Sequence, residues 1–197
     1  MTVVESDRID MAESDPEWTL DEMFEAIERM PLFEGYKAEI VEGVVVMSPH
    51  RHVHARIMRL IMRALEDEFG MDALVSFDER IDFPGHLNGF CPDVVKLRDT
   101  AEQTSRGLWR YQDVEFVAEV VSRSTGMNDY GPKKTAYAAA EVAVYLIADP
   151  YQGRCHVYTR PKEDDYAMET TVAFGEPIDL TDTPLGLVLD TAGFPRD

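Results

Sequence analysis

The sequence has no run of roughly 18 consecutive apolar residues, the length that a membrane-spanning helix needs. Its start, MTVVESDRID, is acidic and lacks the basic and apolar regions of a secretory signal. Two cysteines are present, Cys91 and Cys155, too few for a disulfide framework or a thiolate metal cluster. We therefore expect a soluble, cytoplasmic protein with no membrane partner and with reduced, buried thiols.

Basic residues are also scarce, with 19 Lys and Arg against 38 Asp and Glu, which gives a formal net charge of −19. A polyanion repels nucleic acid and anionic membranes at long range. Most of the excess lies at the ends, since residues 1–30 hold ten acids against two bases and residues 161–197 hold nine against two. The segment 47–64 contains four arginines and no acid, so it is the one locally cationic stretch.

A chain of 197 residues is long enough for one domain with a sizeable core. We expect residues 1–18 to be an acidic, disordered N-terminal segment. Residues 19–197 are expected to form a single domain, in which 160–197 is a C-terminal extension.

Hydrophobic spacing predicts an α/β order of elements. A first helix is expected within residues 16–31, where Thr19 and Glu22 form a capping box. A hairpin follows, with a tight turn at Glu42-Gly43, and then a helix over 53–69 with an apolar stripe and a cationic face. Strands are expected within 73–83, 90–97, 114–121, 142–150, 154–160 and 166–174, with a helix beyond Pro132.

The stretch FVAEVV, residues 116–121, is apolar enough for a central strand, yet it contains one carboxylate, Glu119. An unpaired buried charge costs several kcal/mol, so Glu119 needs a partner. Strand alternation places it on the same face as Val117 and Val121. The best partner is Asp93, which leads directly into another apolar strand. Two carboxylates repel unless a cation lies between them or one binds a proton, and oxygen ligands of this kind suit Mg²⁺ or Mn²⁺.

Pro92-Asp93, followed on a later core strand by Glu119-Val120-Val121, resembles the arrangement found in PD-(D/E)XK nucleases. Three segments, AEIVEGVVVMSP, HARIMRL and AEVVSRST…DYGPKKTAYAAAEVAVYLIADP, are similar to the Uma2-type restriction endonucleases within that superfamily. The resemblance covers roughly residues 19–160. It implies a restriction-endonuclease-like fold, a mixed central β-sheet flanked by α-helices, with a divalent-metal phosphodiesterase site.

Carried over by position, the resemblance implies that Asp93 and Glu119 bind the metal and that the Val120 carbonyl is a third ligand. Glu39 would be the acidic residue that the first hairpin contributes to the catalytic site.

The lysine that the superfamily pattern places two residues after the glutamate is replaced here by Val121. The resemblance implies that a helix lysine takes over its catalytic role. The matching residue is Lys133, with Lys134 as the competitor. Glu141 is a second departure, because relatives usually have a small residue there.

The candidates for binding nucleic acid are one histidine, three arginines and a lysine: His54, Arg56, Arg59, Arg63 and Lys134. Because the net charge is negative, DNA binding is expected to be weak and easily screened by salt. The alternative is that the arginines form a solvated helix face and that His54 only begins the helix. A homodimer is expected, through edge strands such as RCHVYTR and through the hairpin.

Three functional classes remain. The first is a Mg²⁺-dependent endonuclease that hydrolyses phosphodiester bonds of DNA. The second is a nuclease fold that has lost catalysis and binds nucleic acid or protein, and the third is a metal-dependent hydrolase of another phosphoester. The alternative to all three is that these residues have only structural roles. Asp93 would then end a proline turn, and Glu119 would be a surface acid on an edge strand. Lys133 would be solvated, and Asp129 would be a cap or loop acid.

Overall fold

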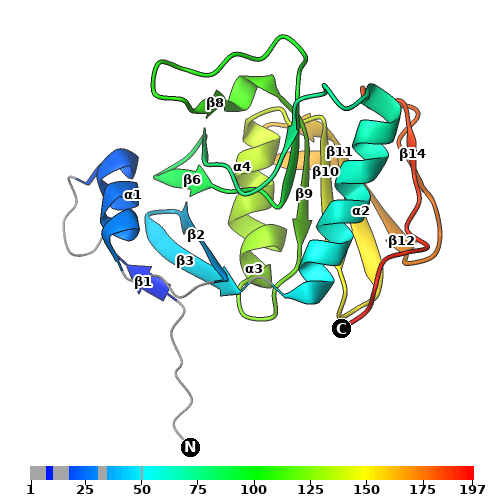
Figure 1. Cartoon of the computed structure of the whole chain (residues 1–197), viewed down its shortest axis with the longest axis horizontal. Coiled ribbons are helices and arrows are strands. Elements are labelled where there is room, and N and C mark those ends of the chain that lie inside the picture. The colour runs from blue at the N-terminus through cyan, green and yellow to red at the C-terminus, as the bar shows by residue number, and fades with distance from the viewer. Residues whose placement is uncertain (1–7, 11–17, 31–34, 50) are drawn as a thin grey trace, which may run out of the picture.

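In the described part of the chain, strands form two six-stranded sheets, which we name the core sheet and the hairpin sheet (Figure 1). The computed structural model describes residues 8–10, 18–30, 35–49 and 51–197. The core sheet contains, in order, β12 (Asp165–Ala173), β11 (Arg154–Lys162), β10 (Val144–Asp149), β9 (Val114–Val120), β7 (Val94–Leu97) and β4 (Val75–Ser76). The hairpin sheet contains, in order, β1 (Arg8–Asp10), β3 (Val44–Pro49), β2 (Tyr36–Val41), β6 (Asn88–Phe90), β5 (Ile81–Phe83) and β8 (Trp109–Arg110).

The remaining elements are helices and a short strand pair. The α-helices are α1 (Leu20–Arg29), α2 (His52–Phe69), α3 (Gly126–Asn128) and α4 (Lys134–Ala139). Two further helical turns are η1 (Tyr111–Asp113) and η2 (Asp129–Lys133), and the strand pair is β13 (Ile178–Asp179) with β14 (Val188–Leu189).

The core sheet is mixed, because β9 and β10 run parallel whereas its other neighbouring strands run antiparallel. Parallel neighbours need a crossover, and the helical segment 126–139 supplies it. The predicted fold, a mixed sheet flanked by α-helices, is confirmed.

Two segments that were each predicted as one strand are divided between the sheets. Residues 73–83 give β4 in the core sheet and β5 in the hairpin sheet, and residues 90–97 end β6 and then form β7. The second change of sheet falls at Pro92, because proline has no N–H with which to continue a ladder. The link therefore places Asp93 between the two sheets, at the entry to β7.

Side chains along β9 alternate between two cores. Phe116 and Ala118 pack with α2, whereas Val117 and Val121 pack with α4 and the hairpin sheet. Glu119 belongs to the second face and is 1% exposed. Its predicted face is confirmed, and the alternative of a surface acid on an edge strand is wrong because β9 lies between β10 and β7.

The three longer α-helices, α1, α2 and α4, each bury apolar side chains. α2 packs on the core sheet through Ile57 and Ile61, which confirms the predicted stripe. α1 packs on the hairpin sheet through Met23 and Ile27. α4 places Tyr137 against residues of both sheets, so it fills the space between them.

The local signals in the first two elements are confirmed. The Thr19 hydroxyl accepts the Glu22 N–H at 3.3 Å, and a Glu22 carboxylate oxygen accepts the Thr19 N–H at 2.8 Å, which completes the capping box. The β2–β3 turn has φ of 50° at Glu42 and 77° at Gly43, the left-handed conformations that a two-residue hairpin loop needs.

The helix predicted beyond Pro132 begins earlier. Helical turns run from Gly126 to Ala139, and Gly131 interrupts them with φ −115° and ψ −107°. Pro132 follows this break, where its missing N–H does not interrupt a regular ladder. The earlier start brings Asp129 into the same helical segment as Lys133.

Both surfaces expected to form a homodimer are already covered within one chain. The segment RCHVYTR belongs to β11, which β10 and β12 flank, so the edge is β12. The β2–β3 hairpin lies between β1 and β6. Dimerisation through these strands would require the chain to open its own pairing.

Three other expectations concern the chain as a whole. Of the segment 1–18, residues 8–10 form β1 and Trp18 precedes the first helix, whereas 1–7 and 11–17 lie outside the described residues. Cys91 and Cys155 are free and buried, as predicted. Within the described ranges, no helix combines the length and apolar character needed to cross a membrane.

Ile61→Ala should lower the free energy of unfolding by about 2–5 kcal/mol, because Ile61 is fully buried between α2 and the core sheet. Leu60→Ala, at the neighbouring and only partly buried position, should cost less. Urea denaturation followed by circular dichroism measures both losses. Equal losses would contradict this packing of α2.

Candidate active site

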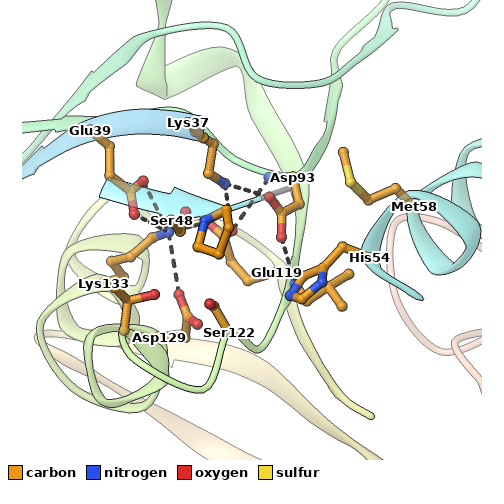
Figure 2. Close-up of a pocket in the computed structure, with 13 residues that line it drawn as sticks. Lys37, Glu39, Ser48, His54, Met58, Asp93, Glu119, Ser122, Asp129 and Lys133 are labelled. Atoms are coloured by element: carbon orange, nitrogen blue, oxygen red, sulfur yellow. Dashed lines mark hydrogen bonds and ion pairs between the residues drawn. The ribbon is translucent and has the colours of Figure 1, made fainter. Parts of the chain in front are cut away.

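A small cavity of about 20 Å³ lies where the two sheets, α2 and the crossover helix meet (Figure 2). This is roughly the space that one water molecule needs. Its charged lining residues, each at most 9% exposed, are Lys37, Glu39, Asp93, Glu119, Asp129 and Lys133. Its other lining residues are Ser48, Pro49, His54, Met58, Val120, Ser122 and Thr125.

Sequence spacing explains two pairs in this set. Lys37 and Glu39 are two residues apart on β2, so strand alternation directs both side chains to one face. Asp129 and Lys133 are four residues apart in the helical segment, which places them on one side of it. Each pair therefore enters the cavity as a unit.

Asp93 and Glu119 become neighbours through the pairing of β7 with β9. Val94 lies opposite Ala118 in the antiparallel register. The next positions outward, Asp93 and Glu119, therefore lie side by side. The Asp93 N–H donates to Glu119 Oε2 at 3.3 Å, and the Val120 N–H donates to Asp93 Oδ2 at 2.8 Å.

The Lys37 ammonium lies between these two carboxylates (Figure 2). Its Nζ pairs closely with Asp93 Oδ1 and lies 3.7 Å from Glu119 Oε2. It also lies 3.9 Å from Asp78. Asp93 and Glu119 are thus close enough to share a single cation, and the cation they share in this structure is a lysine.

Lys133 binds Glu119 from the other side. Its Nζ lies 2.7 Å from Glu119 Oε1, 3.1 Å from both carboxylate oxygens of Glu39, and 3.3 Å from Asp129. The Tyr137 hydroxyl, one turn along the helix, also donates to Glu119 Oε1, at 2.6 Å. The predicted residues Glu39, Asp93, Glu119 and Lys133 therefore converge in one cavity, with Val120 in its lining.

The cavity holds four carboxylates against two ammonium groups, an excess of two negative charges when all are ionised. Burial raises the pKa of Asp129 to about 8, although Lys133 opposes this rise. Burial also raises the pKa of Glu119 against the attraction of both lysines. Burial by itself lowers the pKa of Lys133, but the surrounding carboxylates outweigh it and hold that pKa above its ordinary value. The cavity therefore favours further positive charge, from a proton or from a cation.

A divalent metal fits this set of donors in chemistry and in charge. Mg²⁺ and Mn²⁺ prefer carboxylate and carbonyl oxygens, and the excess of carboxylates in the cavity favours such an ion. Among the described residues, however, no three His, Cys, Asp or Glu side chains are arranged as ligands around a common point. The Lys37 ammonium occupies the position that Asp93 and Glu119 share. The residues thus suit a metal once Lys37 has moved away from them.

His54 lies on α2 at the edge of the cavity and is 7% exposed (Figure 2). Its Nε2 is 3.0 Å from the Val121 carbonyl oxygen and must carry the hydrogen, because a carbonyl only accepts. Burial lowers the pKa of His54, which keeps the ring neutral at pH 7. Its Nδ1 has no hydrogen-bond partner in the described part of the chain. His54 is therefore placed to accept a hydrogen bond near the site, and its contact with nucleic acid stays a prediction.

Lys134 does not reach the cavity. Its Nζ lies 2.9 Å from Asp165 and 5.2 Å from the centre of the Tyr158 ring. Of the two competing lysines, only Lys133 contacts the buried acids.

Arg56, Arg59 and Arg63 are exposed on α2 and lie outside the cavity. Arg63 lies 3.7 Å from Asp67 on the same helix. The cationic face therefore ends in acids one turn later, and its contact with DNA stays a prediction.

Three residues of the site were missed from the sequence. Lys37 shares a strand face with Glu39, and Tyr137 lies one helical turn after Lys133, so spacing offered a signal for both. Asp129, interpreted as a cap or loop acid, lies four residues before Lys133 and is buried beside it. These signals became decisive only once β2 and the crossover helix were known to meet at Glu119.

Comparison with known proteins identifies the family of the chain. The model of the Uma2 family, described as "Putative restriction endonuclease", matches residues 22–192. The chain belongs to the Uma2 family. This membership supports a nuclease function.

A solved structure has the same fold. It is described as "a putative nuclease belonging to DUF820 from Anabaena variabilis ATCC 29413". It matches with a TM-score of 0.68 and 14% sequence identity over 90% of this chain and 97% of that chain. No curated protein matches the chain significantly.

In metal-free buffer, Asp129→Asn should weaken the pH dependence of stability. The folded protein holds a proton on Asp129 up to about pH 8, whereas the unfolded chain releases it near pH 3.8. Between these values the folded state binds more protons, so the free energy of unfolding of the wild type falls as pH rises. The asparagine variant lacks this contribution.

Urea denaturation in EDTA across that pH range measures the difference. Asp72→Asn, at an exposed position, is the matched control and should behave as the wild type. Identical pH profiles for Asp129→Asn and the wild type would show that Asp129 is not held protonated.

Proposed function

We propose that this Uma2-family protein is a Mg²⁺- or Mn²⁺-dependent endonuclease that hydrolyses phosphodiester bonds of DNA. The observation that carries the proposal is the pairing of Asp93 with Glu119 around one cation, with Lys133 on the far side of Glu119. Membership of a family described as restriction endonucleases supports the same reaction class.

The chain's own residues have distinct roles in this proposal. Asp93, Glu119 and the Val120 carbonyl would hold the ion, and the Val120 N–H keeps the Asp93 carboxylate oriented. A bound Mg²⁺ polarises a phosphoryl oxygen and lowers the pKa of its water. Lys133 would orient the attacking water and offset the negative charge that develops on the phosphate, while Glu39 holds the Lys133 ammonium through both carboxylate oxygens.

Lys37 is the counter-ion that the carboxylates use when no metal is bound. Its side chain would have to leave Asp93 and Glu119 for a metal to enter, because two cations cannot share the same oxygens at short range. A lysine released at this position would lie beside the phosphate that the metal binds.

The same lysine favours a second candidate function. If Lys37 stays between Asp93 and Glu119, the protein is a nuclease fold that binds nucleic acid or protein without cleaving. Metal binding and cleavage are therefore tested separately.

The wild type should cleave plasmid DNA in Mg²⁺ or Mn²⁺. Glu119→Gln removes a metal-binding charge and Lys133→Met removes the ammonium, so each should slow cleavage by at least about 100-fold. Lys134→Met is the matched control and should cleave as the wild type, because Lys134 pairs with Asp165 instead. Metal binding without cleavage of plasmid, single-stranded DNA or RNA would favour the second candidate.

Lys37→Met should destabilise the metal-free protein but strengthen its binding of metal. In EDTA the variant should melt at a lower temperature than the wild type, because Asp93 and Glu119 lose a buried partner, a change that costs about 3–5 kcal/mol in comparable pairs. Added Mn²⁺ should raise its melting temperature more than that of the wild type, since the ion no longer competes with an ammonium. Differential scanning calorimetry measures both effects. The same Mn²⁺-induced shift in both proteins would show that Lys37 does not occupy the metal position.

A further inference from the structure

A second, larger hollow of about 630 Å³ runs along the outer side of α2. One wall is α2, and the other comes from the segment between α2 and β5. Its apolar lining consists of Ala55, Met58, Met62, Met71 and Phe77. Met71 is 79% exposed and Phe77 is 51% exposed, which is unusual for two large apolar side chains in one groove. A single copy of the chain leaves this apolar surface in water.

The charges that border the groove follow an order along α2. Arg59 and Arg63 come first, and Glu66 and Asp67 follow one turn later. Arg63 is engaged with Asp67 on its own helix. The side chains of Arg59 and Glu66, in contrast, form no ion pair or hydrogen bond with any described residue. The face therefore presents one unpaired positive and one unpaired negative charge, separated along the helix.

A helix face with this order of charges is complementary to the same face of a second copy whose α2 runs in the opposite direction. Opposite charges then meet twice across a two-fold axis, because both contacts of an isologous interface are equivalent. Pairing Arg59 with Glu66 of the partner subunit also places Met62 close to the axis. A shift that paired Arg59 with Asp67 of the partner subunit would set Arg63 against itself, which like-charge repulsion disfavours.

We propose that this groove is a homodimer interface, in which the α2 helices of two copies pack antiparallel and exchange Arg59–Glu66 ion pairs. The apolar side chains of the groove supply the buried area, and the charge order sets the register. The interface differs from the strand surfaces first expected to dimerise, because those are paired within the chain.

A nucleic acid strand fits the groove less well. Three acids, Glu66, Asp67 and Asp78, line it beside the two arginines, on a protein with a net charge of −19. Phosphates would meet these acids at close range, whereas a second copy brings arginines to them. Burial of the exposed methionine and phenylalanine side chains against a second copy is also more favourable than contact with the polar sugar-phosphate backbone of a nucleic acid.

The proposed dimer would place two cavities on one particle. His54 and Met58 line both the groove and the small cavity, so the partner would lie beside the cavity mouth. With 1.5 Å of rise per residue and an axis near Met62, the two His54 positions would lie about 25 Å apart along the helices. The dimer itself does not depend on the proposed nuclease reaction.

Sedimentation equilibrium tests the interface with charge-swap variants. The wild type should show a species of twice 22.3 kDa at micromolar concentration. Arg59→Glu and Glu66→Arg each create two like-charge contacts, so each should raise the dimer dissociation constant by at least about 100-fold. The double variant Arg59→Glu/Glu66→Arg restores both pairs and should dimerise as the wild type.

Arg56→Glu is the matched control, because it changes the net charge as Arg59→Glu does but lies on α2 outside the groove. It should leave the dissociation constant unchanged, and circular dichroism should show the same helix content for all variants. A monomeric wild type, single variants that dimerise normally, or a double variant that stays monomeric would each overturn the proposal. A monomeric wild type whose affinity for a DNA duplex in Ca²⁺ is lost in Arg59→Glu would instead assign the groove to nucleic acid.

Discussion

The site depends on two buried ammonium groups that hold four buried carboxylates together. Lys37 joins Asp93 and Glu119, and Lys133 joins Glu119, Glu39 and Asp129. Removing either lysine would leave uncompensated carboxylates in a buried region, which is far more costly than losing a surface ion pair. The same arrangement explains why the cavity attracts cations, since its acids still outnumber its bases.

These ion pairs also connect the parts of the fold. Lys37 and Glu39 belong to the hairpin sheet, Glu119 belongs to the core sheet, and Lys133 belongs to the crossover between two parallel strands. Asp93 lies where the chain passes from one sheet to the other after Pro92. A functional site at such a junction can be assembled precisely only when both sheets are formed. Its chemistry and its tertiary stability are therefore linked.

The charge of the molecule acts differently at the cavity and at its surface. Inside, a small excess of acid selects for a cation with oxygen ligands. On α2, the arginines predicted as a cationic face are followed by Glu66 and Asp67, so the surface is bipolar along the helix. A bipolar face on a polyanionic protein is better suited to a reversed copy of itself than to a phosphate backbone.

Local patterns in the sequence were sufficient for much of the fold. The Thr19 cap, the turn at Gly43 and the apolar stripe of α2 follow from interactions within a few residues, and each is as predicted. The link between Asp93 and Glu119 could also be inferred, because a charge in an apolar strand demands a neighbour. The division of two predicted strands between the sheets could not be inferred, because each half pairs with a strand that lies far away in the sequence or in the other sheet.

The sequence by itself determined which residues must be buried, and with them the need to neutralise Glu119. Only the tertiary structure decided what neutralises it. Lys133 and Lys134 are adjacent in sequence, but successive helical residues point about 100° apart, so packing alone directs one to the acids and the other to Asp165. Lys37 likewise reaches Glu119 across 82 positions of sequence, because a buried charge is satisfied by whichever segment the fold brings beside it.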